Sequence, residues 1–249
     1  MDIAGKVVLV TGANRGLGKA FVEAFLEAGA TRVYAGAREP SAIPAVFADP
    51  RVAGVALDVT SRDQVAAAAR ACPDVDVLVN NAGILLKSQV LTDGAEERFR
   101  REMEVNVFGT LAMCRAFAPV LARRGGGAIV NMLSVVTWFT SPFHSTYCAS
   151  KHAALSVTDA VRMELKAQGT RVMAVHAGFI DTDMAAHFTQ PKVSPRQVAD
   201  RTVEGLRADA DQVLADERSE GIWAAMRKDP ASLRALMQRQ WDEAQARQG

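Results

Sequence analysis

Cysteine is scarce in this 249-residue chain, and its three copies, Cys72, Cys114 and Cys148, show no pairing pattern. The number is odd, no CxxC pair occurs, and no cluster of histidine and cysteine has metal-ligand spacing. This pattern argues against a disulfide scaffold and against a zinc site. We therefore interpret the cysteines as small apolar side chains of a protein in a reducing compartment, and we expect a cytoplasmic protein without a bound metal.

Charge of one sign and long apolar runs are also missing. The 29 Lys and Arg residues almost balance the 28 Asp and Glu residues, which leaves a net charge of +1. This balance provides no basic surface for a phosphate backbone, so we expect no nucleic acid partner. No apolar run reaches the roughly 18 residues of a membrane span, and the start MDIAGK lacks the apolar stretch of a signal peptide. We therefore expect no membrane partner.

Short apolar runs alternate with helical patterns, and this alternation predicts the fold. The first run, Lys6–Thr11, has the β-branched composition of a buried parallel strand. Further strands are predicted at Thr31–Ala37, Val52–Leu57, Val75–Val79, Ala128–Leu133 and Arg171–His176, with a weaker candidate at Gln212–Ala215. Helical patterns fill the gaps, notably at Leu17–Ala28, Val105–Arg123, Tyr147–Gln168 and Pro195–Arg207. The fold class is therefore α/β: a single doubly wound (Rossmann-type) parallel sheet of about seven strands with helices on both faces.

No linker, repeat or low-complexity segment interrupts the chain, so we predict one domain over residues 1–249. Residues 219–249 are interpreted as a C-terminal helical extension of that domain. They are charged, with apolar groups at near-helical spacing: Trp223, Met226, Leu233, Leu236, Met237 and Trp241. This apolar face either packs on the body or on another subunit, or it covers a substrate as a lid.

A glycine-rich turn, Thr11–Gly18 (TGANRGLG), joins the first strand to the first helix. Gly12 suits a tight turn, Gly16 lets backbone amides approach a pyrophosphate, and Gly18 permits close packing of helix and strand. The helix N-terminus adds partial positive charge for an anion. Because the turn directly follows the N-terminal strand, it predicts a dinucleotide site.

The end of the second strand predicts which dinucleotide binds. An NAD site usually has an acidic residue about 20 residues beyond the turn, where it holds the ribose 2′-hydroxyl. Here Ala37 and Arg38 stand in that place, and Arg15 lies within the turn. Two guanidinium groups without a carboxylate suit a 2′-phosphate, so we predict NADP(H). Glu39 comes slightly too late and is expected to face solvent.

Several further motifs occur in a fixed order. Asn80-Asn-Ala-Gly83 follows the fourth predicted strand, Asn106 lies in the next helix, Ser134 ends the fifth strand, and Tyr147-Cys-Ala-Ser-Lys151 opens a long helix. Together with TGANRGLG, these motifs resemble the short-chain dehydrogenase/reductase family, in its compact single-domain branch, from about Lys6 to Ala215.

The resemblance implies a catalytic set of Asn106, Ser134, Tyr147 and Lys151. In the family, the lysine also binds the nicotinamide ribose hydroxyls, and the asparagine helps to hold a proton-relaying water. The resemblance also implies Asp58 beside the adenine, with Asn80 and Gly83 stabilising the sheet and bordering the cofactor. The predicted cofactor-binding residues are Gly12, Asn14, Arg15, Gly16, Leu17, Gly18, Arg38, Asp58, Val59, Asn80, Ala82, Gly83, Tyr147, Lys151, Gly178, Ile180 and Thr182.

Tyr147 is one of only two tyrosines, and the other, Tyr34, is expected to be structural in a strand. Tyr147 and Lys151 stand four residues apart, so a helix places them on one face. A cation about 5 Å from the phenol, at an effective dielectric near 20, contributes about 3 kcal/mol, or roughly two pKa units downward. Tyr147 is therefore predicted to exchange a proton with a carbonyl or alcohol oxygen, while Ser134 stabilises the charge on that oxygen.

After the sixth predicted strand, the sequence departs from the family pattern. The family usually has Pro-Gly here, followed by a threonine that contacts the nicotinamide carboxamide. Gly178 and Thr182 match, but Ala177 replaces the proline and removes a fixed φ angle. Either this wall is looser, or its backbone contacts persist without the proline. His176 and His187 have no evident partners in the sequence, and His152 is expected to point away from the chemistry.

An aromatic-rich loop between Ser134 and Tyr147, and a short segment at Met184–Ser194, are expected to form opposite walls of a substrate pocket. The candidate lining residues are Trp138, Phe139, Phe143, His144, Met184 and Phe188. Such walls suit an apolar ketone, aldehyde or secondary alcohol. Alternatively, these aromatic rings only pack the loop.

We predict an oxidoreductase that transfers a hydride between NADP(H) and a small to medium apolar ketone or aldehyde. The alternatives are a catalytically silent NADP(H)-binding sensor or scaffold, and a nucleotide-dependent methyltransferase, in which the Ser134–Tyr147–Lys151 set has no purpose. Apolar residues on several faces of the helix from Val105, such as Phe108 and Leu111, indicate a homodimer or homotetramer. In the family, this helix and the Tyr147 helix commonly form a subunit interface.

Overall fold

The computed structural model describes residues 1–247, apart from the side chains of residues 42, 44 and 45, and within them seven strands form one parallel sheet. The strands are β1 (Val7–Thr11), β2 (Arg32–Ala37), β3 (Val52–Ala56), β4 (Val77–Asn80), β5 (Gly127–Met132), β6 (Thr170–His176) and β7 (Gln212–Leu214). Their spatial order is β3-β2-β1-β4-β5-β6-β7. The predicted strands and the α/β fold class are confirmed. The order reverses between β1 and β4, and such a switch point opens a crevice at the carboxyl ends of the strands.

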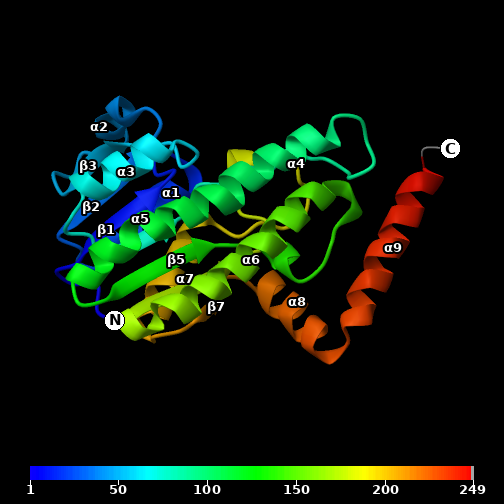
Figure 1. The fold of residues 1–249 in the computed structure, drawn as a ribbon. Helices are drawn as coiled ribbons and strands as arrows, with labels where there is room; N and C mark the ends of the chain where they lie inside the picture. Colours follow the sequence, from blue (N-terminus) through cyan, green and yellow to red (C-terminus); the bar gives the residue numbers. More distant parts are fainter. Residues whose placement is uncertain (248–249) are drawn as a thin grey trace.

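Helices cover both faces of this sheet (Figure 1). On one face, α1 and α7 enclose a core that contains Phe21, Phe25 and Val198. On the other face, α3, α5 and α6 enclose a core that contains Leu78 and Phe117. The helices are α1 (Gly16–Glu27), α2 (Ile43–Val46), α3 (Arg62–Ala71), α4 (Ala95–Met103), α5 (Thr110–Arg123), α6 (Ser145–Leu165), α7 (Pro195–Arg207), α8 (Glu217–Lys228) and α9 (Pro230–Ala246). Short 3₁₀ turns are η1 (Pro40–Ala42), η3 (Val135–Thr137), η4 (Pro142–His144), η5 (Lys166–Gln168) and η6 (Asp183–Ala185), and η2 (Glu104–Gly109) is a π-helical turn.

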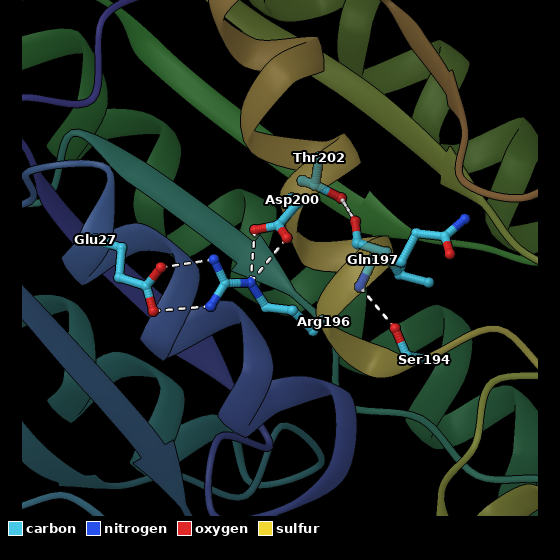
Figure 2. A network of polar contacts seen from close by, with 7 residues as sticks. Glu27, Ser194, Arg196, Gln197, Asp200 and Thr202 are labelled. Carbon is cyan, nitrogen blue, oxygen red and sulfur yellow. Dashed lines mark hydrogen bonds and ion pairs between the residues drawn. The ribbon is translucent and has the colours of Figure 1, made fainter.

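A polar network joins α1 to α7 on the first face (Figure 2). Arg196, in the first turn of α7, donates two hydrogen bonds to the carboxylate of Glu27 on α1, at 2.8 and 2.6 Å. Its Nε also donates to Asp200. The Ser194 hydroxyl caps α7 by accepting from the Gln197 amide at 3.1 Å. This paired geometry fixes α7 over the helix that follows the glycine-rich turn.

The continuous helical run Ala95–Arg123 is long and apolar enough by composition to cross a membrane. The mean hydropathy of its most apolar window is 1.5, and half of that window is buried in the structure. This run packs against α3, α6 and β4. The same composition is typical of a core helix, and these contacts give it that place in the fold.

Helices α8 and α9 form the C-terminal extension and project from the sheet-and-helix body (Figure 1). A capping box between Asp216 and Ser219 starts α8, and the Asp229 side chain caps α9. The predicted extension over residues 219–249 is thus helical as far as the structure describes it, and Gln248 and Gly249 lie outside the described residues.

Candidate active site

A cleft of about 1440 Å³ opens at the carboxyl ends of the central strands. At one end it is lined by the glycine-rich turn and by the residues after β2 and β3. At the other end it is lined by η4, η6 and one face of α9. We call the first region the cofactor half of the cleft and the second the substrate half, after the roles that the sequence predicts for them.

The glycine-rich turn has the predicted backbone geometry. Gly12 and Gly16 have φ angles of +64° and +53°, which favour glycine. A Cβ atom on Gly18 would lie 2.0 Å from the carbonyl oxygen of Gly12, so helix and turn touch there. Helix α1 starts at Gly16 without a side-chain cap, which leaves its first amides facing the cleft for an anion.

The adenosine end of the cofactor half contains Ala37, Arg38 and Glu39, all of which line the cleft. Glu39 is exposed, as expected. Asp58 accepts hydrogen bonds from the Thr60 hydroxyl at 2.7 Å and from its amide at 2.9 Å. These bonds, together with the positive charge of Arg38, lower the pKa of Asp58. The carboxylate that faces this end of the cleft is therefore ionised and held in place.

Arg15, at the other side of the turn, donates a 2.7 Å hydrogen bond to Asp183. Both side chains are largely exposed, at 70% and 80%. Gly16 lies against Thr182, since a Cβ on this glycine would be 3.2 Å from the threonine methyl group. Thr182 and Asp183 therefore both contact the glycine-rich turn.

Two asparagines predicted in the site lie behind the cleft. Asn80 is buried, and its amide donates to the Oδ1 of Asn131 at 2.8 Å, so it joins β4 to β5 and does not line the cleft. Asn106 lies in the π-helical turn η2, where its side chain binds both backbone groups of Ile84 and the Ser150 hydroxyl. These contacts agree with the expected role of Asn80 in stabilising the sheet, and its side chain does not line the cleft.

Ser134 follows β5 and begins the turn η3. Its Oγ accepts a weak hydrogen bond from the Val136 amide at 3.4 Å. Its carbonyl oxygen accepts from the Thr137 hydroxyl at 2.7 Å and lies 3.2 Å from Nδ1 of His176. His176 is buried, and burial lowers its pKa to about 4. A neutral imidazole thus helps to hold the serine backbone. This contact between the ends of β5 and β6 was not predictable from the sequence, in which His176 has no evident partner.

Helix α6 places Tyr147 and Lys151 on the cleft side, as their spacing predicts. The Lys151 Nζ lies 5.7 Å from the centre of the Tyr147 ring. It donates a 2.9 Å hydrogen bond to the carbonyl oxygen of Met132 at the end of β5. Burial lowers the pKa of Lys151 to about 8.

The predicted lowering of the Tyr147 pKa is wrong for the chain alone. Burial raises the pKa of Tyr147, nearby Cys148 and Glu102 add to this effect, and the Ser134 hydroxyl opposes it in part. The sequence argument treated the phenol as solvated and counted only the lysine charge, whereas desolvation dominates here. The phenol is therefore protonated at neutral pH and ready to donate.

Glu102 on α4 is a fully buried carboxyl group that sequence reasoning did not single out. Its Oε1 accepts a 2.7 Å hydrogen bond from the Leu86 amide in the segment after β4. Among residues 1–247, its Oε2 has no hydrogen-bond partner. Burial raises the pKa of Glu102, and this favours its protonated form. Its helix, α4, packs against α6, the helix that carries Tyr147 and Lys151.

The other predicted cofactor residues all line the cleft. The Gly178 amide donates to Asp216 at 2.8 Å, and the Ala177 carbonyl accepts from the Val135 amide at 3.0 Å. The wall that contains Ala177 is therefore held by hydrogen bonds of its backbone, so its backbone contacts persist without the proline. The lining residues predicted for the cofactor are Gly12, Asn14, Arg15, Gly16, Leu17, Gly18, Arg38, Asp58, Val59, Ala82, Gly83, Tyr147, Lys151, Gly178, Ile180 and Thr182.

The substrate half contains five of the six predicted lining residues: Phe139, Phe143, His144, Met184 and Phe188. His144 meets Phe188 edge to face at 5.1 Å, and burial lowers the pKa of His144. Trp138 is the exception, because it stacks on His176 at 4.2 Å and packs against Trp223 of α8, away from the cleft. The neighbouring Phe139 takes the inward position.

Helix α9 adds lining residues that the sequence placed only in a general apolar pattern. Met237 and Gln240 line the cleft, and the Trp241 ring lies 5.9 Å from that of Phe143. Within the described residues, no cluster of three or more His, Cys, Asp or Glu side chains could hold a metal ion.

Comparison with known proteins gives consistent matches. The family described as short chain dehydrogenase matches residues 6–192. The short chain dehydrogenase mpl6 of Monascus purpureus is 33% identical over 237 residues, which cover 90% of this chain and 79% of that protein. The crystal structure of a short chain dehydrogenase from Burkholderia cenocepacia in complex with NADP has a TM-score of 0.91 and 41% identity, and the match covers 95% of this chain and 99% of that chain.

A further solved structure differs in its cofactor. It is a 3-ketoacyl-(acyl-carrier-protein) reductase from Brucella melitensis complexed with NADH, with a TM-score of 0.77 and 28% identity. The match covers 86% of this chain and 95% of that chain. Relatives of this fold thus bind either dinucleotide. From its matching family, its parallel sheet and its cleft at the switch point, this chain belongs to the short-chain dehydrogenase/reductase family of oxidoreductases.

Proposed function

We propose that this chain is an NADPH-dependent carbonyl reductase that acts on a small to medium apolar ketone or aldehyde. One observation carries the proposal: Ser134, Tyr147 and Lys151 line the same cleft as the glycine-rich turn, with Tyr147 and Lys151 on one face of α6. A phenol is protonated at neutral pH, so Tyr147 can donate its proton to a carbonyl oxygen.

The residues present fit a dinucleotide with a 2′-phosphate. The packing of Gly18 on Gly12 and the open amides of α1 form a cradle for a pyrophosphate. Arg38 provides a guanidinium group at the adenosine end, where residue 37 is alanine, and Arg15 provides a second one on the glycine-rich turn, where it pairs with Asp183. Their charge and fork geometry favour NADPH over NADH. The NADP-bound relative from Burkholderia cenocepacia supports this choice.

When bound, NADPH supplies the hydride. Tyr147 donates its phenolic proton to the carbonyl oxygen of the substrate, and the Ser134 hydroxyl donates a hydrogen bond to the same atom. Lys151, cationic below its pKa of about 8, stabilises the phenolate that remains and binds ribose hydroxyls. Asn106 holds the backbone of Ile84 and the hydroxyl of Ser150 at the inner end of the cleft. We assign it a positioning role.

The test is a substrate panel of apolar ketones and aldehydes with NADPH and NADH side by side, followed at the absorbance band of the reduced nicotinamide. Replacing Tyr147→Phe should lower turnover by on the order of 10³-fold while NADPH binding is unchanged. Full activity in Y147F would disprove the mechanism. NADPH binding without turnover on any carbonyl compound would instead favour the silent sensor or scaffold.

We also propose one domain that includes α8 and α9, and a homodimer or homotetramer. Phe108 of η2 and Met163 of α6 support the oligomer, because they are 52% and 71% exposed apolar side chains on contacting helices. Cys72, Cys114 and Cys148 are free and buried, which supports a cytoplasmic location. Light scattering of the purified protein tests the assembly, and a stable monomer would exclude it.

A further inference from the structure

Helix α9 lies outside residues 6–192, which the family match covers, yet it reaches back to the cleft. Met237 and Gln240 are among the residues that line it. One position further, the Trp241 ring lies 5.9 Å from that of Phe143, which also lines the cleft. The chain beyond the shared family region therefore supplies one wall of the substrate half.

A single buried side chain anchors this wall. Leu233 is the only fully buried residue of the described part of α9, with 4% of its surface exposed. It packs in one cluster with Val135 and Phe139, which follow Ser134 in the chain. The position of α9 is thus tied to the segment that carries the serine of the catalytic set.

The side of α9 that faces the cleft is uncharged. Met237 and Gln240 provide apolar or neutral groups to the cleft, and Trp241 packs on Phe143 beside them, whereas Arg239, which points away around the helix, is exposed. The rest of the substrate half carries Phe139, Phe143, Met184 and Phe188, together with the polar side chains of Gln190 and Arg218. An extended apolar substituent can therefore leave the reacting carbonyl at Tyr147 and remain in contact with apolar side chains along α9 and its neighbours.

We propose that α9 is the specificity-determining wall of this enzyme, with Met237 and Trp241 binding an extended alkyl or aryl substituent of the carbonyl substrate. This inference rests on the proposed reductase function. Each buried methylene group raises affinity about fourfold. The preference for long over short substrates should therefore grow with chain length until the substituent spans the α9 wall.

The experiment compares the wild type with M237A, W241A and the control variant R239A, which changes the exposed face of the same helix. The probes are butanone and undecanone with NADPH. We expect M237A and W241A each to lower kcat/KM for undecanone at least tenfold and to leave butanone within twofold. R239A should behave as the wild type for both ketones. Met237→Leu keeps the apolar volume and should restore undecanone reduction if folding is intact.

A binding measurement separates this inference from the proposed reaction. In the Y147F background with NADPH present, undecanone affinity is measured calorimetrically with and without M237A. A tenfold loss of affinity supports the α9 wall, because binding is measured without turnover. Failure of the wild type to reduce any ketone with NADPH would instead overturn only the reductase proposal. Equal effects of M237A and R239A, or a wild type that prefers butanone to undecanone, would overturn the α9 proposal.

Discussion

The two halves of the cleft are built in different ways. The cofactor half is held by the backbone at the carboxyl ends of the strands, where the Ala13 amide donates to the Gly36 carbonyl at 3.0 Å and the Leu57 amide donates to the Ala37 carbonyl at 2.9 Å. The substrate half is held by side chains, such as His144 against Phe188 and Phe143 against Trp241, from short helices and α9. Substitutions in the cofactor half are therefore expected to disturb the ends of the strands. Substitutions in the substrate half can change the side chains that line the cleft and leave the sheet intact.

This difference matches the extent of the family resemblance. The matched residues 6–192 contain the glycine-rich turn and the Ser134–Tyr147–Lys151 set, while α9 is additional. In the proposed reductase, the residues that every carbonyl substrate would meet are therefore fixed by the sheet. The proposed choice among those substrates depends on a separate element.

The largest expected effect is at the packing point of the cofactor half. Gly18→Ala places a Cβ 2.0 Å from the Gly12 carbonyl oxygen, so the turn has to move. We expect the free energy of unfolding to fall by about 3 kcal/mol, at the upper end of overpacking, and NADPH to lose its stabilising effect on the thermal transition.

Gly221→Ala is the matched control, because a Cβ at this position in α8 meets nothing within 4 Å. It should raise the free energy of unfolding by about 0.5 to 1 kcal/mol, as alanine does in a helix interior. Equal behaviour of the two variants in chemical denaturation would contradict the difference between the halves.

A smaller effect is expected at His176, which holds the backbone of Ser134 from behind the cleft. Burial lowers its pKa from 6.5 to about 4, so between these values the unfolded chain binds a proton that the folded chain does not. The contribution of His176 to the free energy of unfolding is fully present above pH 6.5. It is lost as the pH falls toward 4, by on the order of 3 kcal/mol. His176→Asn should flatten this part of the profile in urea titrations. A wild-type profile without a slope in this window would rule out the buried neutral imidazole.

The third prediction sharpens the cofactor choice. Arg38→Asp replaces a guanidinium at the adenosine end with a carboxylate, and the loss of a charge-assisted hydrogen bond should weaken NADPH binding about thirtyfold. NADH should bind as well as before or better. Arg70→Asp, at an exposed position of α3 outside the cleft, is the control. Steady-state KM values for both dinucleotides decide between a 2′-phosphate contact and a solvated arginine.

The smallest effect is expected at the bridge between the glycine-rich turn and η6. Arg15 and Asp183 are largely exposed, so their ion pair contributes little. Asp183→Asn frees Arg15 and should tighten NADPH binding by no more than about fivefold, an effect that decreases with added salt. Weaker NADPH binding in D183N would show that Asp183 positions Arg15 for the phosphate and does not compete with it.

Sequence reasoning predicted the features that depend on neighbours in the chain. The strand ranges, the geometry of Gly12 and Gly18, and the shared helix face of Tyr147 and Lys151 follow from local spacing. It did not predict the features that depend on packing between distant segments. His176 gained a partner only because β5 and β6 are adjacent, and Trp138 turned outward because α8 provides Trp223. The Tyr147 pKa was missed for the same reason, since burial cannot be read from a four-residue spacing.

The tryptophans have a practical consequence for spectroscopy. The chain has three, and Trp138, Trp223 and Trp241 all lie in or against the C-terminal extension. The intrinsic fluorescence of the protein is therefore a local optical probe of α8 and α9, and the sheet contributes no tryptophan emission of its own. A variant that carries W138F and W223F would leave Trp241 as the single emitter. Its spectrum would then report in real time how α9 responds when a ketone enters the cleft.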